Sequence, residues 1–314
     1  MGFSNMLTNL LILGVSLFIV MRGAAMATKY AVRVAKSLNF SSYVVGFLVI
    51  AVISILPELF ISLNAALRGD SSFGLGLILG SNIADLTLIF ALVVFLTGRS
   101  VRVEQKIINN HKLYPFILML PLVLGLDGEF NRIDGAALLL AGVIFYYLSL
   151  KKEGAIMLAV TQSSDKLKNV SLLLLSLALL LVGSHFAVTS ATQIAGGLGV
   201  STVLIAMLII ALGTTMPELM FSLKSVKQGS DSLAVGDILG TVLADATLVI
   251  GLIALINPFT FPQSTIYVGG VFMVAASFIL FSFMRSRHQV TRAEAFALTM
   301  FWLTFILVQC IIHL

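Results

Sequence analysis

Four acidic side chains lie inside strongly apolar stretches of this sequence, and they form two matched pairs. Glu58 and Asp85 in the first half correspond to Glu218 and Asp245 in the second, at a constant offset of 160 residues. An ionised carboxylate is costly in apolar surroundings, so acids kept there are usually functional. The duplication therefore predicts that both halves contribute carboxylates to one cation site.

Hydroxyl groups accompany these acids at helical spacing. Each acid follows a serine or threonine by four residues, which places a hydroxyl on the same helix face as the carboxylate. The alternative for each hydroxyl is a hydrogen bond to a carbonyl of its own helix. The hydroxyl residues are Ser54, Ser81, Thr214 and Thr241, and Thr215 adds a second hydroxyl to the later copy.

A proline precedes each glutamate. Pro57 and Pro217 lie within apolar segments, and a proline cannot donate to the carbonyl four residues earlier. The freed carbonyls are those of Ile53 and Gly213, and a bound cation can satisfy such an oxygen in lipid. The predicted ligand set is all oxygen, which suits Ca²⁺ or Na⁺ and does not suit Zn²⁺ or Cu⁺. The single cysteine, Cys310, excludes an internal disulfide.

The composition predicts an all-α membrane protein. Of the 314 residues, 59% are hydrophobic and only 11% are charged, and the mean hydropathy is +1.08. The apolar segments have helix length, which disfavours an outer-membrane barrel. We predict ten transmembrane helices, near residues 6–28, 42–67, 72–97, 112–126, 134–150, 170–193, 202–223, 233–256, 264–284 and 293–313.

The basic residues predict the orientation. Sixteen of the 19 lysines and arginines lie in loops that follow odd-numbered segments. The positive-inside rule places those loops in the cytoplasm and both termini outside the cell membrane. The positive net charge thus needs no nucleic-acid partner to explain it, and Arg22 lies near the inner end of the first segment, where it can snorkel.

The repeat and the segment count together predict two inverted halves. Five segments in each half is an odd number, so the second half enters the membrane with the opposite orientation, as in many secondary transporters. We place the first half at 1–151, a cytoplasmic linker at 152–168 and the second half at 169–314. Glycines spaced four apart in both copies predict close helix contacts; they are Gly76, Gly80, Gly236 and Gly240.

These motifs resemble those of the cation/Ca²⁺ exchanger superfamily, most closely the prokaryotic sodium/calcium exchangers. Their repeats read Gly-Thr-Ser-x-Pro-Glu on one helix and Gly-Ser-x-x-x-Asn/Asp on the next, and here residues 213–218 read GTTMPE and residues 80–85 read GSNIAD. The resemblance implies that Glu58 and Glu218 are central ligands, with Asp85 and Asp245 in the other two positions. It also implies that the hydroxyl residues line flanking sites and that the first and sixth helices form a sliding gate.

Three positions depart from the family pattern. Ile55 replaces a hydroxyl, which weakens one monovalent site. Asp85 and Asp245 are both acids where the family leads us to expect one amide, so we expect at least one of them to be protonated when Ca²⁺ is bound. Gly-Asp at 236–237 replaces the usual Gly-Asn, and we interpret Asp237 as a helix-start residue near the cytoplasmic surface.

The expected activity is antiport of Ca²⁺ against Na⁺ by alternating access, with no enzyme activity, no cofactor and no obligate protein partner. The expected partners are the lipid bilayer and inorganic cations. The main alternative is Ca²⁺/H⁺ exchange on the same fold, which Ile55 and the extra acid favour. Two other classes are an intramembrane aspartyl protease, suggested by the Gly-Asp at 236–237, and a passive cation channel.

Overall fold

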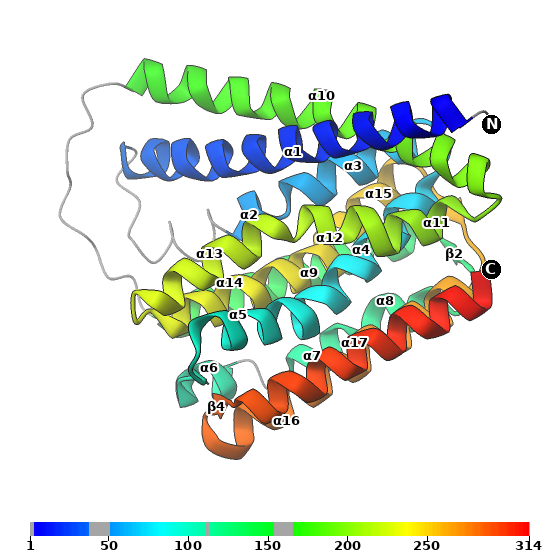
Figure 1. The fold of residues 1–314 in the computed structure, drawn as a ribbon. Helices are drawn as coiled ribbons and strands as arrows, with labels where there is room; N and C mark the ends of the chain where they lie inside the picture. The colour runs from blue at the N-terminus through cyan, green and yellow to red at the C-terminus, as the bar shows by residue number, and fades with distance from the viewer. Residues whose placement is uncertain (1–2, 38–50, 111–112, 154–165, 314) are drawn as a thin grey trace.

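The computed structural model describes residues 3–37, 51–110, 113–153 and 166–313. This part of the chain is almost entirely helical, as the composition predicts (Figure 1). It contains eight helices or joined helices that are long and apolar enough to cross a membrane, together with two shorter apolar ones, Leu56–Leu67 and Tyr114–Leu124. The segment predicted at 42–67 begins outside the described residues, and most of the predicted linker at 152–168 also lies outside them.

The first half contains nine α-helices and one wider π-helical turn, η2, within the described residues. These elements are α1 (Phe3–Ser37), α2 (Ala51–Ser54), α3 (Leu56–Leu67), α4 (Ser71–Ala84), η2 (Asp85–Ile89), α5 (Phe90–Thr97), α6 (Gln105–Asn110), α7 (Tyr114–Ile117), α8 (Met119–Leu124) and α9 (Arg132–Glu153).

The second half contains eight α-helices and three π-helical turns within its described residues. Its elements are α10 (Lys166–Leu198), α11 (Thr202–Ile205), η3 (Ala206–Ile210), α12 (Ala211–Thr214), α13 (Met216–Lys227), α14 (Asp231–Ala244), η4 (Asp245–Val249), α15 (Ile250–Ile256), η5 (Thr265–Gly270), α16 (Val271–Arg287) and α17 (Arg292–His313).

The helices α1 and α10 form a long antiparallel pair along one side of the bundle (Figure 1). Two glycines allow this close contact: a Cβ atom on Gly23 would lie 3.2 Å from the carbonyl oxygen of Ser176, and one on Gly183 would lie 2.8 Å from Val20. The outer faces of both helices expose large apolar side chains, including Leu11 and Leu174. Such faces are suited to lipid.

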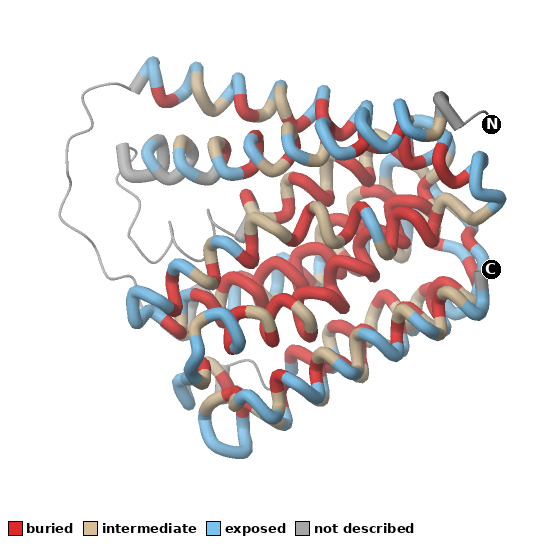
Figure 2. Tube along the Cα trace, in the orientation of Figure 1, coloured by how far each residue is buried: buried red, intermediate tan, exposed pale blue. Residues whose placement is uncertain are grey.

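The centre of the bundle consists of two continuous helical rods, α4–η2–α5 and α14–η4–α15. In their most apolar windows, 89% and 83% of the residues are buried, against 33% in α1 and in α10. Figure 2 shows these buried rods surrounded by partly exposed helices. Polar groups placed on the two rods are therefore kept from solvent by several surrounding helices.

Two short antiparallel ladders connect the halves. Strand β1 (Val101–Arg102) pairs with β4 (Gln289–Val290), and β2 (Glu129–Phe130) pairs with β3 (Phe259–Thr260). Each ladder joins one strand of the first half to one strand of the second. Together with the packing between the rods, the ladders fix the position of one half relative to the other.

Candidate cation site

Both predicted helix interruptions are present, and each places a glutamate at the start of a new helix. Helix α2 ends at Ser54 and α3 begins at Leu56, with Pro57 in its first turn. Helix α12 ends at Thr214 and α13 begins at Met216, with Pro217 in its first turn. A carboxylate in the first turn is favoured by the positive end of the helix dipole. Each glutamate also accepts a hydrogen bond from its own main-chain N–H group.

The two aspartates lie at a second kind of irregularity, which the sequence did not predict. Asp85 begins the π-helical turn η2, and Asp245 begins η4. A π-helical turn widens the helix by one residue, and such turns are frequent at functional sites. The repeat therefore matches in backbone conformation as well as in residue type, and each aspartate projects from a locally widened helix.

The four predicted acids are all buried, each at 2% exposure or less. One oxygen of Glu58 and one of Glu218 have no hydrogen-bond partner, and both oxygens of Asp85 and of Asp245 have none. The acids of the two halves lie near one another, because Glu218 and Asp245 are both within electrostatic reach of Glu58. An unpartnered buried carboxylate is unfavourable, so this region is suited to a cation that compensates the charge.

The acids do not form a closed metal cluster. Among the described residues, no three acidic, histidine or cysteine side chains lie close enough together to form a metal-binding group. A hard cation placed here would also need hydroxyl and carbonyl oxygens, which Ca²⁺ accepts in irregular geometry. The four-carboxylate pocket therefore stays a prediction.

The predicted hydroxyl residues are brought to this region, but their hydrogen bonds differ from the simple spacing argument. Ser81, Thr214 and Thr215 donate to carbonyls three residues earlier in their own helices, which is the alternative considered above. Thr214 also lies within hydrogen-bonding reach of Glu58, an acid of the other half. The hydroxyl of Thr241 is buried without a partner. The lone pairs of these oxygens remain available to a cation.

The interpretation of Asp237 as a surface residue at a helix start is wrong. Asp237 lies inside α14, and its side chain is only 6% exposed. Its Oδ1 atom accepts a hydrogen bond of 3.2 Å from the hydroxyl of Ser54, the last residue of α2. The sequence offered one signal for the burial of Asp237, which is an acid at a position where the family pattern usually has asparagine.

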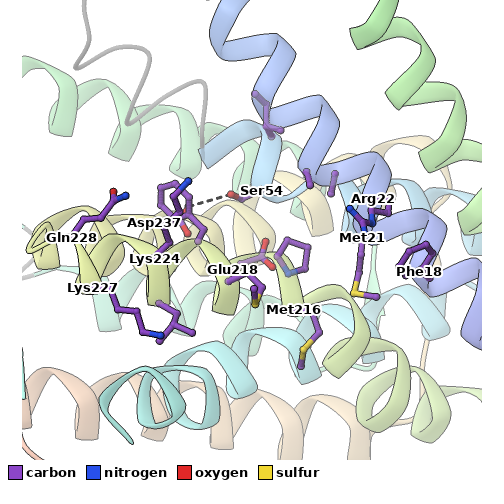
Figure 3. A pocket seen from close by; sticks show the side chains of 17 residues that line it. Phe18, Met21, Arg22, Ser54, Met216, Glu218, Lys224, Lys227, Gln228 and Asp237 are labelled. Atoms are coloured by element: carbon purple, nitrogen blue, oxygen red, sulfur yellow. Dashed lines mark hydrogen bonds between the residues drawn. The ribbon is translucent and has the colours of Figure 1, made fainter. Parts of the chain in front are cut away.

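A cavity of about 930 Å³ leads to this region. It lies between α1, α2, α13 and the first part of α14, and Glu218, Ser54 and Asp237 all line it (Figure 3). The exposed side chains of Lys224 and Lys227 line it at the far end of α13. The cavity therefore connects an exposed, basic end of the bundle to one of the two predicted central glutamates.

Two tyrosines fix the helix that carries Asp245. Tyr114 donates to the carbonyl oxygen of Leu239 at 2.9 Å, and Tyr146 donates to that of Gly240 at 2.7 Å. Both carbonyls lie in the last turns of α14, before the π-helical turn. Buried hydroxyl groups need hydrogen-bond partners, and these two carbonyls provide them, so each bond ties the first half of the chain to α14. The sequence analysis did not identify either tyrosine.

The family model for "Sodium/calcium exchanger protein" matches residues 8–151 and 168–311. The chain belongs to this exchanger family. The resemblance inferred from the repeats is thereby confirmed, and the family consists of multi-pass membrane proteins that transport cations and are not enzymes. The proteins that it is similar to include both Na⁺/Ca²⁺ and H⁺/Ca²⁺ exchangers.

Individual relatives cover from about three quarters to nearly all of the chain. The sodium/calcium exchanger MaX1 of Methanosarcina acetivorans is 24% identical over 96% of this chain and 98% of its own length. The putative antiporter CaxA of Alkalimonas amylolytica is 31% identical over 73% of this chain and 74% of its own length. This chain is similar to each of these antiporters along most of their length.

Solved structures share the fold. The sodium-calcium exchanger NCX_Mj superposes with a TM-score of 0.69 at 24% identity, covering 96% of this chain and 98% of that one. The H⁺/Ca²⁺ exchanger CAX superposes with a TM-score of 0.77 at 17% identity, covering 96% of this chain and 86% of that one. At these identities the likeness concerns the fold, which exchangers driven by either ion have in common.

Proposed function

We propose that this exchanger transports Ca²⁺ outward across the cell membrane in exchange for Na⁺, by alternating access. The observation that carries the proposal is the pair Glu58 and Glu218. Each is buried in the first turn of a helix that begins at a proline interruption, and each retains one carboxylate oxygen without a partner. Two such carboxylates, one from each half, match the charge of one Ca²⁺ and offer it the oxygen ligands that it prefers.

The proposed membrane arrangement has ten spans in two inverted halves, 1–151 and 169–314, joined by a cytoplasmic linker at 152–168. Both termini are outside. The two short apolar helices support this count, because adding them to the eight longer ones gives ten. The ladders that pair β1 with β4 and β2 with β3 are the reciprocal contacts expected of two related halves.

The cavity supports a passage on one side of the membrane. Lys224 and Lys227 line it in the last turn of α13, at the end that the positive-inside rule assigns to the cytoplasm. In this arrangement Glu218 is reached from the cytoplasmic side, and sliding of the α1–α10 pair closes this route and opens the opposite one. Asp85, Asp245, Ser81 and Thr241 then complete the ligand set deeper in the two rods.

A second candidate is Ca²⁺/H⁺ exchange on the same fold. It is favoured by Ile55, which lacks a hydroxyl at the helix interruption, and by the number of buried acids that could carry protons. Sodium is favoured by the paired hydroxyls Thr214 and Thr215 beside the other glutamate.

Purified protein in liposomes separates these candidates. Ca²⁺ uptake is measured under an imposed Na⁺ gradient, an imposed pH gradient, or neither. Na⁺-driven uptake that is abolished by Glu58→Gln and by Glu218→Gln, and retained by Glu129→Gln, a control at an exposed residue of β2, supports the proposal. Uptake driven only by the pH gradient selects the second candidate. Ca²⁺ movement that persists in both glutamate variants contradicts the assigned site.

A further inference from the structure

Asp237 is a buried acid that the proposed central site does not use. It lies eight residues before Asp245 on the same helical rod, or about 12 Å along its axis. It is closer than Asp245 to the turn at Gln228–Ser230, which links α13 to α14. Asp237 therefore lies between the basic end of the cavity and the deeper aspartate.

The surroundings of Asp237 leave its charge uncompensated. Its Oδ1 atom accepts the hydrogen bond from Ser54, while its Oδ2 atom is buried without a partner. In the described part of the chain the only ion pair is that of Arg99 with Asp231, so no lysine or arginine there lies within salt-bridge distance of Asp237. A buried carboxylate in this condition, on the wall of a cavity, is suited to binding a cation from that cavity.

Other oxygens line the same part of the cavity. Ser54 keeps its oxygen lone pairs after donating its hydrogen to Asp237. The neighbouring Ile53 also lines the cavity, and its carbonyl is the one that Pro57 cannot satisfy. A carboxylate, a hydroxyl and a carbonyl form an oxygen set of the kind that hard cations prefer. Figure 3 shows Ser54 and Asp237 facing each other across the cavity wall, on the side of the lysines.

We propose that Asp237 and Ser54 form a second cation site, in the cavity wall, which binds Ca²⁺ or Na⁺ before the ion reaches the central carboxylates. The proposal rests on the exchange function proposed above. It assigns to Asp237 a role at one face of the membrane only, because the cavity reaches this residue from the end that contains Lys224 and Lys227.

The charged groups that line the cavity with Asp237 are Arg22, Lys224, Lys227 and Glu218. They define the rival explanation, in which Asp237 only compensates the charge of a nearby lysine. The two explanations predict opposite effects of Lys224→Gln. If Asp237 serves the lysine, this variant should reproduce the effect of Asp237→Asn. If Asp237 binds the transported cation, removing a positive charge should leave its Ca²⁺ affinity unchanged or increase it.

The test measures Ca²⁺ transport from each face, in inverted and right-side-out vesicles of wild type, Asp237→Asn, Lys224→Gln and Glu129→Gln. For Asp237→Asn we expect the Ca²⁺ concentration for half-maximal transport to rise about tenfold at the cavity face, because ligand charge sets Ca²⁺ affinity. It should not change at the other face or in Glu129→Gln. Equal rises at both faces, or no rise at either, would overturn the proposal.

Equilibrium binding of Ca²⁺ to the purified protein provides a readout that does not depend on transport. Asp237→Asn should weaken Ca²⁺ binding, or should weaken its displacement by Na⁺ if Na⁺ is the occupant, and Ser54→Ala should do the same to a smaller degree. Unchanged binding of both ions in both variants contradicts the second site. Failure of the exchange function itself would appear separately, as absence of gradient-driven uptake in wild-type liposomes.

Discussion

Tyr146 donates a hydrogen bond of 2.7 Å to the main-chain carbonyl of Gly240, a residue of the other half of the chain. Gly240 lies five residues before Asp245, where the π-helical turn begins. The bond is buried, and it is an additional one for this carbonyl, because Gly240 lies within α14 and its carbonyl also faces the N–H group four residues later in the helix.

Tyr146→Phe should therefore destabilise the protein. We expect a loss of about 1 kcal/mol in unfolding free energy, the usual net contribution of one intramolecular hydrogen bond. Thermal unfolding in detergent measures it. The adjacent Tyr147 is 61% exposed, which makes Tyr147→Phe a matched control. Equal midpoints for the two variants would show that the bond contributes nothing measurable.

Arg99 connects the end of one buried rod to the start of the other. Its guanidinium makes two contacts with Asp231, of 2.5 and 2.7 Å, and also donates to the carbonyl of Val226. Hydrogen bonding to the Asp231 carboxylate raises the pKa of Arg99. Because this pKa is raised, the stability that protonated Arg99 gives to the folded protein is fully present below the ordinary arginine pKa. It is lost only at strongly alkaline pH.

Arg99→Gln should lower the unfolding free energy by about 1 kcal/mol, a modest value because the arginine side chain is 41% exposed. The loss should be the same at neutral and mildly alkaline pH, and it should shrink at high salt. Arg102→Gln is the control, since Arg102 reaches Asp231 through its main-chain N–H. A larger effect for Arg102→Gln than for Arg99→Gln would contradict the assignment.

Gly80 is in close contact with the main chain of η3. A Cβ atom at this position would lie 2.2 Å from the carbonyl oxygen of Met207, and main-chain atoms cannot move aside cheaply. Gly80→Ala should therefore cost about 3 kcal/mol or more, the upper end of what overpacking costs, and should also disturb the neighbouring Ser81. Reduced yield of folded protein in size-exclusion chromatography and a lower unfolding midpoint would record the change.

Gly14 is the matched control for that substitution. It lies on an exposed face of α1 with no atom of the described chain within 4 Å of the added Cβ position. Gly14→Ala should be neutral or slightly stabilising, because alanine is the better helix former. If Gly14→Ala were as harmful as Gly80→Ala, the close contact at Gly80 would not be the cause.

Asp85 is expected to make transport sensitive to pH. Asp85 is buried and neither of its carboxylate oxygens has a hydrogen-bond partner, so a proton and a cation can compete for the same group. Protons should then compete with Ca²⁺, so that wild-type Ca²⁺ flux falls as the pH is lowered. Asp85→Asn carries no titratable group and should show a weaker acid dependence. Identical flux–pH profiles for wild type and Asp85→Asn would remove this role.

Close packing of the repeat glycines could be anticipated for only part of the chain. Gly76 and Gly80 contact the main chain of α11 and η3, as the small-residue spacing predicts. In the second copy, no atom of the described residues lies within 4 Å of a Cβ built at Gly236. The repeat-related partner of Gly236 would be Tyr43, which lies outside those residues.

The sequence by itself determined the exchanger family, the two helix interruptions and the four buried acids. These features are local or repeated: a proline removes a hydrogen bond wherever it lies in a helix, and an acid within an apolar segment is costly in any fold. The constant offset between Glu58 and Glu218 also showed that the acids occupy equivalent positions of an internal repeat.

Only the tertiary structure decided which groups meet across the halves. Ser54 and Asp237 are 183 residues apart, and their hydrogen bond depends on how α2 packs beside α14. The contact of Thr214 with Glu58 and the bond from Tyr146 to Gly240 are of the same kind. Periodicity specifies the face of a helix that is apolar, but it does not specify the helix that covers that face. Asp237 therefore resembles a surface residue in the sequence and is buried in the folded chain.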